Sequence, residues 1–168
     1  MVYLKSMTFT NYKSFYGSRE IKFTKGFTLI QGANGSGKSN ILDGFSFVLG
    51  GRDERTDKVL DVITRKSGKV LSNSAEVKIT FDNSDRRIPL DYDEISVLRQ
   101  IRLTPKGSHY SVYKLNDEAT SLTEILESLT EAKVTAEGYN IIKQGKIVER
   151  ATEDPESRRQ LLENIAGT

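Results

Sequence analysis

The sequence predicts a mixed α/β fold organised around a phosphate-binding loop. Residues 32–39 fit the phosphate-loop pattern G-x-x-x-x-G-K-[ST]. An apolar stretch precedes the loop and apolar residues recur at helical spacing after it, as a strand–loop–helix unit requires. Farther along, apolar and polar residues alternate with the period of two that is typical of half-buried strands. Together these patterns predict helix and sheet in one chain.

Length and composition are those of an ordinary domain. The chain has 168 residues, 29% of them charged, with a net charge of +2 and no cysteine. It is long enough to bury a core, and its charge balance indicates no overall basic field for nucleic acid. The lack of cysteine excludes disulfides and thiolate metal sites. Without an apolar run of membrane length or a signal peptide, we expect no membrane contact and a cytoplasmic location.

The N-terminal residues predict a pair of strands. Leu4–Thr10 is the first strand, and the turn-rich segment Asn11–Ser14 follows it. Ile21 and Phe23 mark a second strand. We expect the two strands to pair across a turn at Gly17-Ser18.

The phosphate loop is expected between a strand and a helix. Gly26–Gln31 is the predicted strand, and Gly50-Gly51 ends the predicted helix, as glycine does at helix C-termini. The apolar positions of this helix are Ile41, Leu42, Phe45, Val48 and Leu49. A second, short helix is predicted over Thr56–Thr64.

A β section follows. Ala75–Phe81 alternates strictly, and Asn83–Asp85 turns the chain. Ile95–Leu103 alternates as well, but Arg99 interrupts it at a position where the pattern requires an apolar residue. We therefore predict an antiparallel meander from about Ala75 to Leu115.

The C-terminal third predicts one more hairpin and two helices. Pro105–Gly107 is the turn that leads into Tyr110–Leu115. Ser121 and Glu124 have the spacing of a capping box, which predicts a helix beginning there. Asp154-Pro155 is an N-cap followed by proline, which predicts a final helix. Because the chain ends within that helix, we expect it to be part of a longer protein.

The residue types of the loop predict its chemistry. Its three glycines lack a Cβ, so the chain can curl with its N–H groups directed at phosphate oxygens, next to the positive end of a helix. Lys38 supplies an ammonium for the β- and γ-phosphates, and the Ser39 hydroxyl is a ligand for Mg²⁺. The loop residues are Gly32, Ala33, Asn34, Gly35, Ser36, Gly37, Lys38 and Ser39. The sequence thus predicts binding of a nucleoside triphosphate.

A second segment with chemistry lies about a hundred residues later. Tyr139–Gly145 places Gln144 on a glycine turn after a short apolar strand. The glutamine carbonyl can bind Mg²⁺ and its amide can orient a water molecule.

The chain resembles the structural maintenance of chromosomes (SMC) ATPases. Phe27–Asp43 is similar to their phosphate-loop region, and Asn11–Phe15 to a segment upstream of it. Phe47–Gly50 matches the end of their first helix, Tyr139–Ile147 their glutamine loop, and Arg158–Gly167 the start of their coiled coil. These matches run through the whole chain in order.

The resemblance implies a P-loop NTPase fold of the ABC-type ATPase head, of which residues 1–168 are the N-terminal half. The coiled coil is expected to start near 155–168. The family's signature motif and Walker B carboxylate belong to a C-terminal half, and no such motif occurs here. The implied ligands are ATP and Mg²⁺. The implied partners are the C-terminal half of the same head, a second head, a kleisin-type regulatory subunit and DNA.

The resemblance also implies residue roles. Lys38 and Gln144 serve catalysis, Ser39 and Gln144 hold the metal, and residues 32–39 with Asn40 hold the nucleotide. Lys13 and Ser14 match a nucleotide contact near the α-phosphate and base, with a solvated turn as the alternative. Arg55 is the candidate for an arginine that reaches the phosphates. Arg52 and Lys58 are alternative candidates for the same role. The loop that contains all three residues is shorter than is usual in the family, which puts the role itself in doubt.

Other features have ordinary interpretations. His109, the only histidine, lies beside a hairpin turn and is interpreted as a surface residue. The basic loop Arg65–Lys69 is a solvated turn or a contact for DNA phosphates. Tyr110 and Tyr113 are interpreted as cross-strand packing residues.

The main alternative is the head of the related zinc-hook ATPase of DNA double-strand-break repair. Its glutamine loop and coiled-coil start differ from those here, and it lacks the ending Ile165-Ala166-Gly167. A membrane-transporter ATPase is a more distant alternative, because it would carry its signature motif within a chain of this length. A fragment that acts only as a docking module is a third, non-enzymatic alternative.

Overall fold

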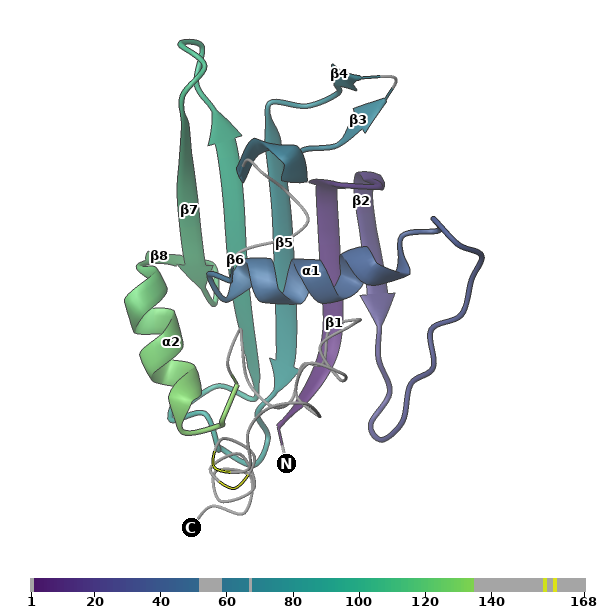
Figure 1. The fold of residues 1–168 in the computed structure, drawn as a ribbon. Coiled ribbons are helices and arrows are strands. Elements are labelled where there is room, and N and C mark those ends of the chain that lie inside the picture. The colour runs from purple at the N-terminus through teal and green to yellow at the C-terminus, as the bar shows by residue number, and fades with distance from the viewer. Residues whose placement is uncertain (1, 52–58, 67, 135–155, 157–158, 160–168) are drawn as a thin grey trace. The chain divides into compact units, whose positions relative to one another are not determined.

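The computed structural model describes residues 2–51, 59–66, 68–134, Glu156 and Arg159. The chain forms two compact units, Met1–Ala136 and Glu137–Thr168. The fold described below is that of the first unit (Figure 1). In the second unit, Glu156 and Arg159 are helical. The predicted glutamine loop and most of the predicted final helix lie outside the described residues.

The described strands form one large sheet and one small one. The large sheet has the order β2-β1-β5-β6-β7-β8, and every neighbouring pair in it is antiparallel. Its strands are β1 (Tyr3–Tyr12), β2 (Phe15–Lys22), β5 (Ser74–Asp82), β6 (Glu94–Leu103), β7 (His109–Leu115) and β8 (Glu118–Thr120). The small sheet pairs β3 (Arg65–Lys66) with β4 (Lys69–Val70). The α/β class and the predicted meander from Ala75 to Leu115 are confirmed.

The turn between β1 and β2 lies earlier than predicted. Tyr12 pairs with Phe15, so the chain turns at Lys13 and Ser14, and Gly17 lies within β2. Asn11 and Lys13 have left-handed φ angles of 50° and 47°. The Asn11 side chain accepts a hydrogen bond of 3.0 Å from the Gly17 N–H. Asparagine tolerates this conformation and bonds local backbone, which is why it can make the turn in place of glycine.

The inner face of the sheet forms the core. On β5, Ala75, Val77, Ile79 and Phe81 are all buried, in the alternation that the sequence predicts. On β6, the inward-facing residues Ile95, Val97 and Ile101 are buried, and Arg99 and Leu103 are half-buried.

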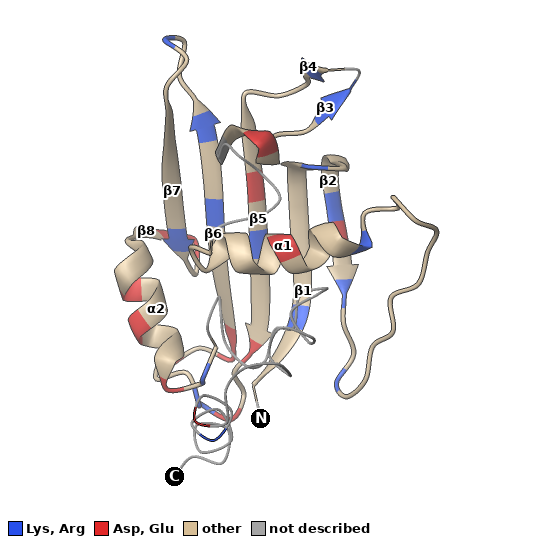
Figure 2. Ribbon diagram, in the orientation of Figure 1, with Lys and Arg blue, Asp and Glu red and all other residues tan. Residues whose placement is uncertain are grey.

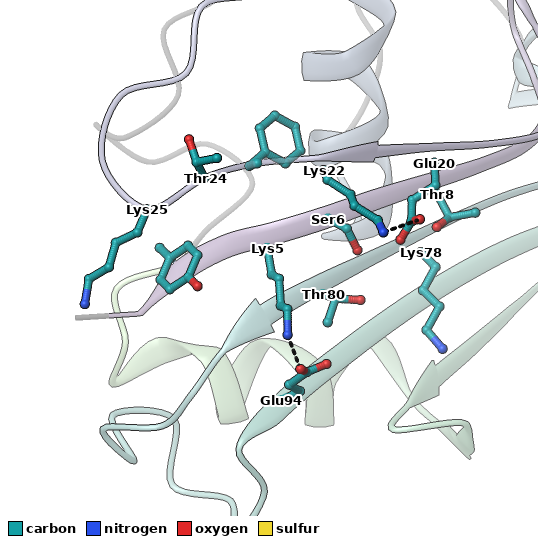
Figure 3. Close-up of a pocket in the computed structure, with 12 residues that line it drawn as sticks. Lys5, Ser6, Thr8, Glu20, Lys22, Thr24, Lys25, Lys78, Thr80 and Glu94 are labelled. Carbon is teal, nitrogen blue, oxygen red and sulfur yellow. Dashed lines mark hydrogen bonds and ion pairs between the residues drawn. The ribbon is translucent and has the colours of Figure 1, made fainter.

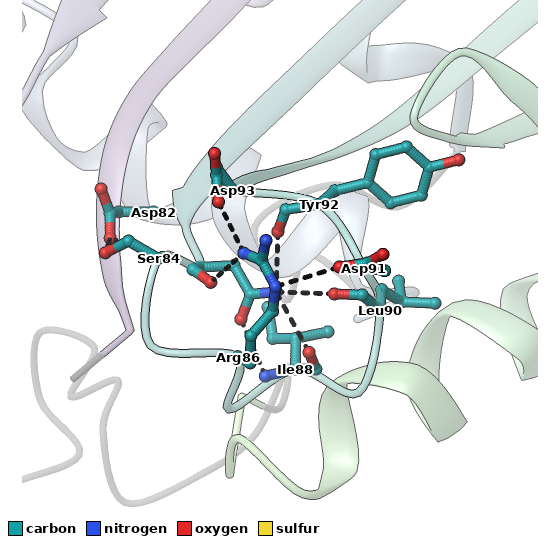
Figure 4. Close-up of polar contacts among 9 residues, drawn as sticks. Asp82, Ser84, Arg86, Ile88, Leu90, Asp91, Tyr92 and Asp93 are labelled. Carbon is teal, nitrogen blue, oxygen red and sulfur yellow. Dashed lines mark hydrogen bonds and ion pairs between the residues drawn. The ribbon is translucent and has the colours of Figure 1, made fainter.

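The loop between β5 and β6 is held by one buried side chain. Asn83 donates to the carbonyl oxygens of Ile88, Leu90 and Tyr92 and accepts from the Ile88 N–H. Arg86, shown in Figure 4, lies over the same loop and pairs with two aspartates. The predicted turn at Asn83–Asp85 is confirmed, and it continues into a loop ordered by hydrogen bonds to its own backbone.

Helix α1 (Lys38–Val48) lies across the strands on the inner face (Figure 1). It contacts β5 and β6. A Cβ at Gly44 would lie 2.4 Å from the buried ring of Phe9 on β1, so the close approach of helix and sheet depends on this glycine. The helix ends as predicted, with Gly50 at a left-handed φ of 80°.

The remaining helices are short. Within the predicted segment Thr56–Thr64, the described residues form a 3₁₀ helix, η1 (Val59–Val62). Helix α2 (Leu122–Thr130) begins at the predicted capping box: the Ser121 side chain accepts from the Glu124 N–H, and the Glu124 carboxylate accepts from the Ser121 N–H. Ile125 and Leu129 of α2 are fully buried.

The prediction of a strand over Gly26–Gln31 is wrong. The segment has no regular secondary structure, and no described strand pairs with it. Phe27 is 86% exposed and Leu29 is 64% exposed. A strand requires a neighbour for its backbone groups, and this segment has none among the described residues. The phosphate loop is therefore followed by the expected helix but not preceded by the expected strand.

Candidate functional site

The phosphate loop adopts an open curl that runs directly into α1. Gly35 and Gly37 have left-handed φ angles of 80° and 94°, which only glycine adopts without strain. Gly37 is the N-cap of α1, with no side-chain cap and no acidic residue in the first turn. The first N–H groups of a helix have no partner within the helix. Their positive end is therefore available to an anion.

Lys38 folds back over this curl. Its Nζ atom donates to the carbonyl oxygens of Gly32 and Ala33, both at 2.7 Å, and lies 3.5 Å from the Ser36 hydroxyl. These are neutral acceptors on an exposed surface. Since a phosphate oxygen is a stronger acceptor for an ammonium than a carbonyl, an incoming triphosphate can take over these bonds.

Two glycines of the loop lie close to serine hydroxyl groups. A Cβ at Gly32 would lie 2.7 Å from the Ser36 hydroxyl oxygen. A Cβ at Gly37 would lie 2.6 Å from the hydroxyl oxygen of Ser14, on the β1–β2 turn. The second contact shows that the turn and the phosphate loop touch, although 23 positions separate them in the sequence.

Further bonds hold the β1–β2 turn against α1. The Asn40 amide donates to the Ser14 hydroxyl at 2.8 Å. Lys13 forms an ion pair of 2.7 Å with Asp43, and their side chains are 11% and 5% exposed. The structure thus places Ser14 beside Gly37 and Asn40 at the start of α1, and Lys13 beside Asp43 farther along the same helix. Their predicted contact with a nucleotide stays a prediction.

Asp43, the buried partner of Lys13, was not among the residues that the sequence predicted for the site. It lies four residues after Ser39, one turn farther along α1, and is buried. A signal was present, because an acidic residue among apolar helix positions needs a cationic partner. The identity of that partner, Lys13, is a consequence of how β1 and α1 pack.

We expect Asp43→Asn to destabilise the protein by about 3 kcal/mol. The substitution removes the carboxylate that pairs with the buried Lys13 ammonium, and burying a charge without that partner is costly. Urea unfolding followed by circular dichroism measures this. The matched control is Asp117→Asn, which breaks the pair with Lys78, where the aspartate is 72% exposed. Exposed pairs contribute little, so the control should unfold like the parent. Equal unfolding midpoints for all three proteins would contradict the prediction.

Of the remaining predicted site residues, the structure describes only Ser39. Gln144, Arg55 and its rivals Arg52 and Lys58 lie outside the described residues. Ser39 lies in the first turn of α1, next to the loop. The described residues contain no cluster of three or more histidine, cysteine or acidic side chains that could hold a metal. The Ser39 hydroxyl is nevertheless a sufficient protein ligand for Mg²⁺, because this ion keeps several waters and takes phosphate oxygens as its other ligands.

A pocket of about 590 Å³ lies elsewhere on the sheet and contains no residue of the phosphate loop. Figure 3 shows its lining, in which Lys5 pairs with Glu94 and Lys22 lies 3.7 Å from Glu20. These pairs are exposed, and exposed pairs are common on solvated sheet faces. We assign this pocket no part in nucleotide binding.

The basic loop Arg65–Lys69 forms the β3–β4 hairpin, with basic residues on both arms (Figure 2). Both arms are exposed, and Arg65 pairs with Asp61 at 3.1 Å.

His109 is exposed at the start of β7, as expected of a surface residue. In the described part of the chain, no helix is long and apolar enough to cross a membrane.

Comparison with known proteins adds to this geometry. A family model described as the RecF/RecN/SMC N terminal domain matches residues 3–138. The chromosome partition protein Smc of Pyrococcus furiosus is 42% identical over 173 residues, which cover 99% of this chain but 14% of that protein. The chain thus spans a small part of the curated relatives it matches.

Solved structures match over nearly the whole chain. A structure from work on ATP-driven dimerization and DNA-stimulated activation of SMC ATPases is 40% identical, with a TM-score of 0.82, covering 97% of this chain and 99% of that one. The Smc head domain of Pyrococcus furiosus, with an extended coiled coil and bound to the C-terminal domain of ScpA, is 40% identical with a TM-score of 0.87. That match covers 99% of this chain and 42% of that chain.

Proposed function

The chain belongs to the RecF/RecN/SMC N-terminal domain family. We propose that it is the N-terminal half of an SMC-type ATPase head and that it binds ATP and Mg²⁺ for a chromosome-partitioning machine. One observation carries this proposal. The uncapped start of α1, the curled loop before it and the β1–β2 turn converge on one surface. The identity to Smc proteins favours this function over the zinc-hook repair ATPase.

In this proposal each site residue has a defined task. The N–H groups of residues 32–39 and the Lys38 ammonium hold the β- and γ-phosphates. The hydroxyl of Ser39 and the side chain of Gln144 hold Mg²⁺, which neutralises phosphate charge. Lys13, Ser14 and Asn40 face the nucleotide from the β1–β2 turn and α1, and Arg55 reaches the phosphates. Hydrolysis additionally requires a carboxylate from the other half of the head to position water.

We further propose that the C-terminal half of the head covers the exposed apolar segment before the phosphate loop. Phe27, Leu29 and Ile30 are 86%, 64% and 40% exposed, and Leu42 on α1 is 42% exposed. Exposed apolar surface of this kind marks an interface. A partner strand from the other half would also supply the backbone hydrogen bonds that residues 26–31 lack.

The remaining partners rest on the relatives. The Smc head of Pyrococcus furiosus binds the C-terminal domain of ScpA, so we propose a kleisin-type subunit for this head. ATP-driven dimerization is described for the SMC ATPase that matches 97% of this chain, so we propose a second, identical head. DNA is the proposed partner of the β3–β4 hairpin, and the location is the cytoplasm, on the chromosome.

The test is ATP-driven pairing of the complete head, made by joining this chain to its C-terminal half. We expect a monomer without nucleotide and a dimer with Mg-ATP when the catalytic carboxylate is replaced to slow hydrolysis, measured by light scattering after size exclusion. Omitting Mg²⁺ is the control and should prevent pairing. A head that neither binds ATP nor pairs would refute the proposed function.

A further inference from the structure

Arg99 is a cation at a core position of the sheet. Its neighbours on the same face of β6, Val97 and Ile101, are both 0% exposed. Among the described residues, no carboxylate pairs with Arg99, and none accepts a hydrogen bond from its buried Nε atom. Burial also lowers the pKa of this guanidinium. An apolar residue would satisfy the β-strand pattern at lower desolvation cost, so the arginine needs a specific reason.

The contacts of Arg99 are to the end of the phosphate-loop helix. Its Nη1 atom donates to the carbonyl oxygen of Phe47 at 2.8 Å, in the last turn of α1, and the same oxygen also accepts from the Gly50 N–H at 3.2 Å. The guanidinium lies 4.4 Å from the centre of the Phe47 ring and 5.3 Å from that of Tyr113 on β7. The last carbonyls of a helix lack partners within the helix and carry its negative end, so a cation there is favourable. Cation–π contact with two rings further favours this position of the guanidinium.

Helix α1 is consequently held at both ends by different parts of the sheet. Asn40 and Asp43 tie its first half to the β1–β2 turn, and Gly44 rests against Phe9 of β1. Arg99 ties its last turn to β6. A helix of 11 residues is about 16 Å long and stiff, so a shift of one end along the axis moves the other end. Misplacement of a binding group by about 1 Å is enough to weaken a site strongly.

From this arrangement, and resting on the proposed function, we propose that Arg99 is a positioning residue of the nucleotide site. It acts through α1: its bond to Phe47 sets the axial position at which the phosphate loop and the β1–β2 turn face the same nucleotide. Arg99 itself touches no ligand.

The test compares ATP affinity with thermal stability in the complete head. Arg99→Met keeps the length and packing of the side chain but removes the charge and the donor. We expect its dissociation constant for Mg-ATP to rise about tenfold. We expect the melting temperature without nucleotide to stay within about 3 °C of the parent, because a buried charge is lost together with its bond. Arg99→Lys, which keeps a cationic donor, should recover at least half of the lost affinity on a logarithmic scale.

The matched control is Arg102→Met, three residues along the same strand, where the side chain is exposed. It should bind Mg-ATP like the parent. Parental affinity in Arg99→Met would overturn the inference. So would an affinity loss that tracks the melting temperature and that lysine does not recover, since that is the behaviour of a packing residue. If Arg99→Met does not fold, Arg99→Gln takes its place with the same expected loss. A parent head that fails to bind ATP would refute the proposed function instead.

Discussion

Lys38→Ala is expected to weaken the binding of ATP to the complete head by about a hundredfold, because it removes the proposed charge-assisted contact to the β- and γ-phosphates. Without nucleotide, the Lys38 ammonium bonds two carbonyl oxygens of its own loop. The substitution therefore removes a phosphate ligand and loosens the loop that holds the other donors. Equilibrium titration with a fluorescent ATP analogue measures the effect.

Two comparisons sharpen this prediction. Lys22→Ala, at an exposed lysine on β2 outside the loop, should leave affinity unchanged. Gln144→Ala should preserve binding and slow turnover, because the glutamine is expected to act mainly once the attacking water is in place. If Lys38→Ala and Gln144→Ala lost binding to the same extent, the proposed division of roles would be wrong.

The second large effect concerns turnover. Residues 1–168 alone should hydrolyse ATP at a rate indistinguishable from buffer, and adding the C-terminal half should restore hydrolysis. The catalytic carboxylate is proposed to come from that half and the signature serine from a second head, where they orient water and stabilise the γ-phosphate. The isolated chain should also self-associate, because Phe27 and Leu29 are exposed apolar side chains next to an unpaired segment.

A steady-state phosphate-release assay together with light scattering follows both properties. The informative control is a C-terminal half whose catalytic carboxylate is replaced by an amide. It should still suppress self-association but should not restore turnover. Substantial hydrolysis by residues 1–168 alone would show that the catalytic carboxylate lies within this chain.

Patterns that depend on neighbouring residues were predictable from sequence. The capping box at Ser121, the alternation of Ala75–Phe81 and the helix end at Gly50 each express a local rule, and the structure confirms the conformation of each. For the phosphate-loop motif, the structure confirms the helix that follows it but not the strand that was predicted before it. The turn at Gly17-Ser18 was predicted wrongly. The rule that favours glycine in turns was outweighed by Asn11, which bonds the local backbone and so completes the turn earlier.

What the sequence determined by itself is therefore the local chemistry: a loop that can curl around phosphate, a helix that begins at its end, and strands with one apolar face. Only the tertiary structure decided which distant side chains meet. It placed Lys13 beside Asp43 and Arg99 against the last turn of α1. It also left the apolar segment 26–31 without a strand partner among the described residues. The reason is physical. A charged residue at a core position, or an apolar segment of strand type, indicates from the sequence that a partner is needed. Which residue becomes the partner depends on how the elements pack in three dimensions, and spacing along the chain does not show this.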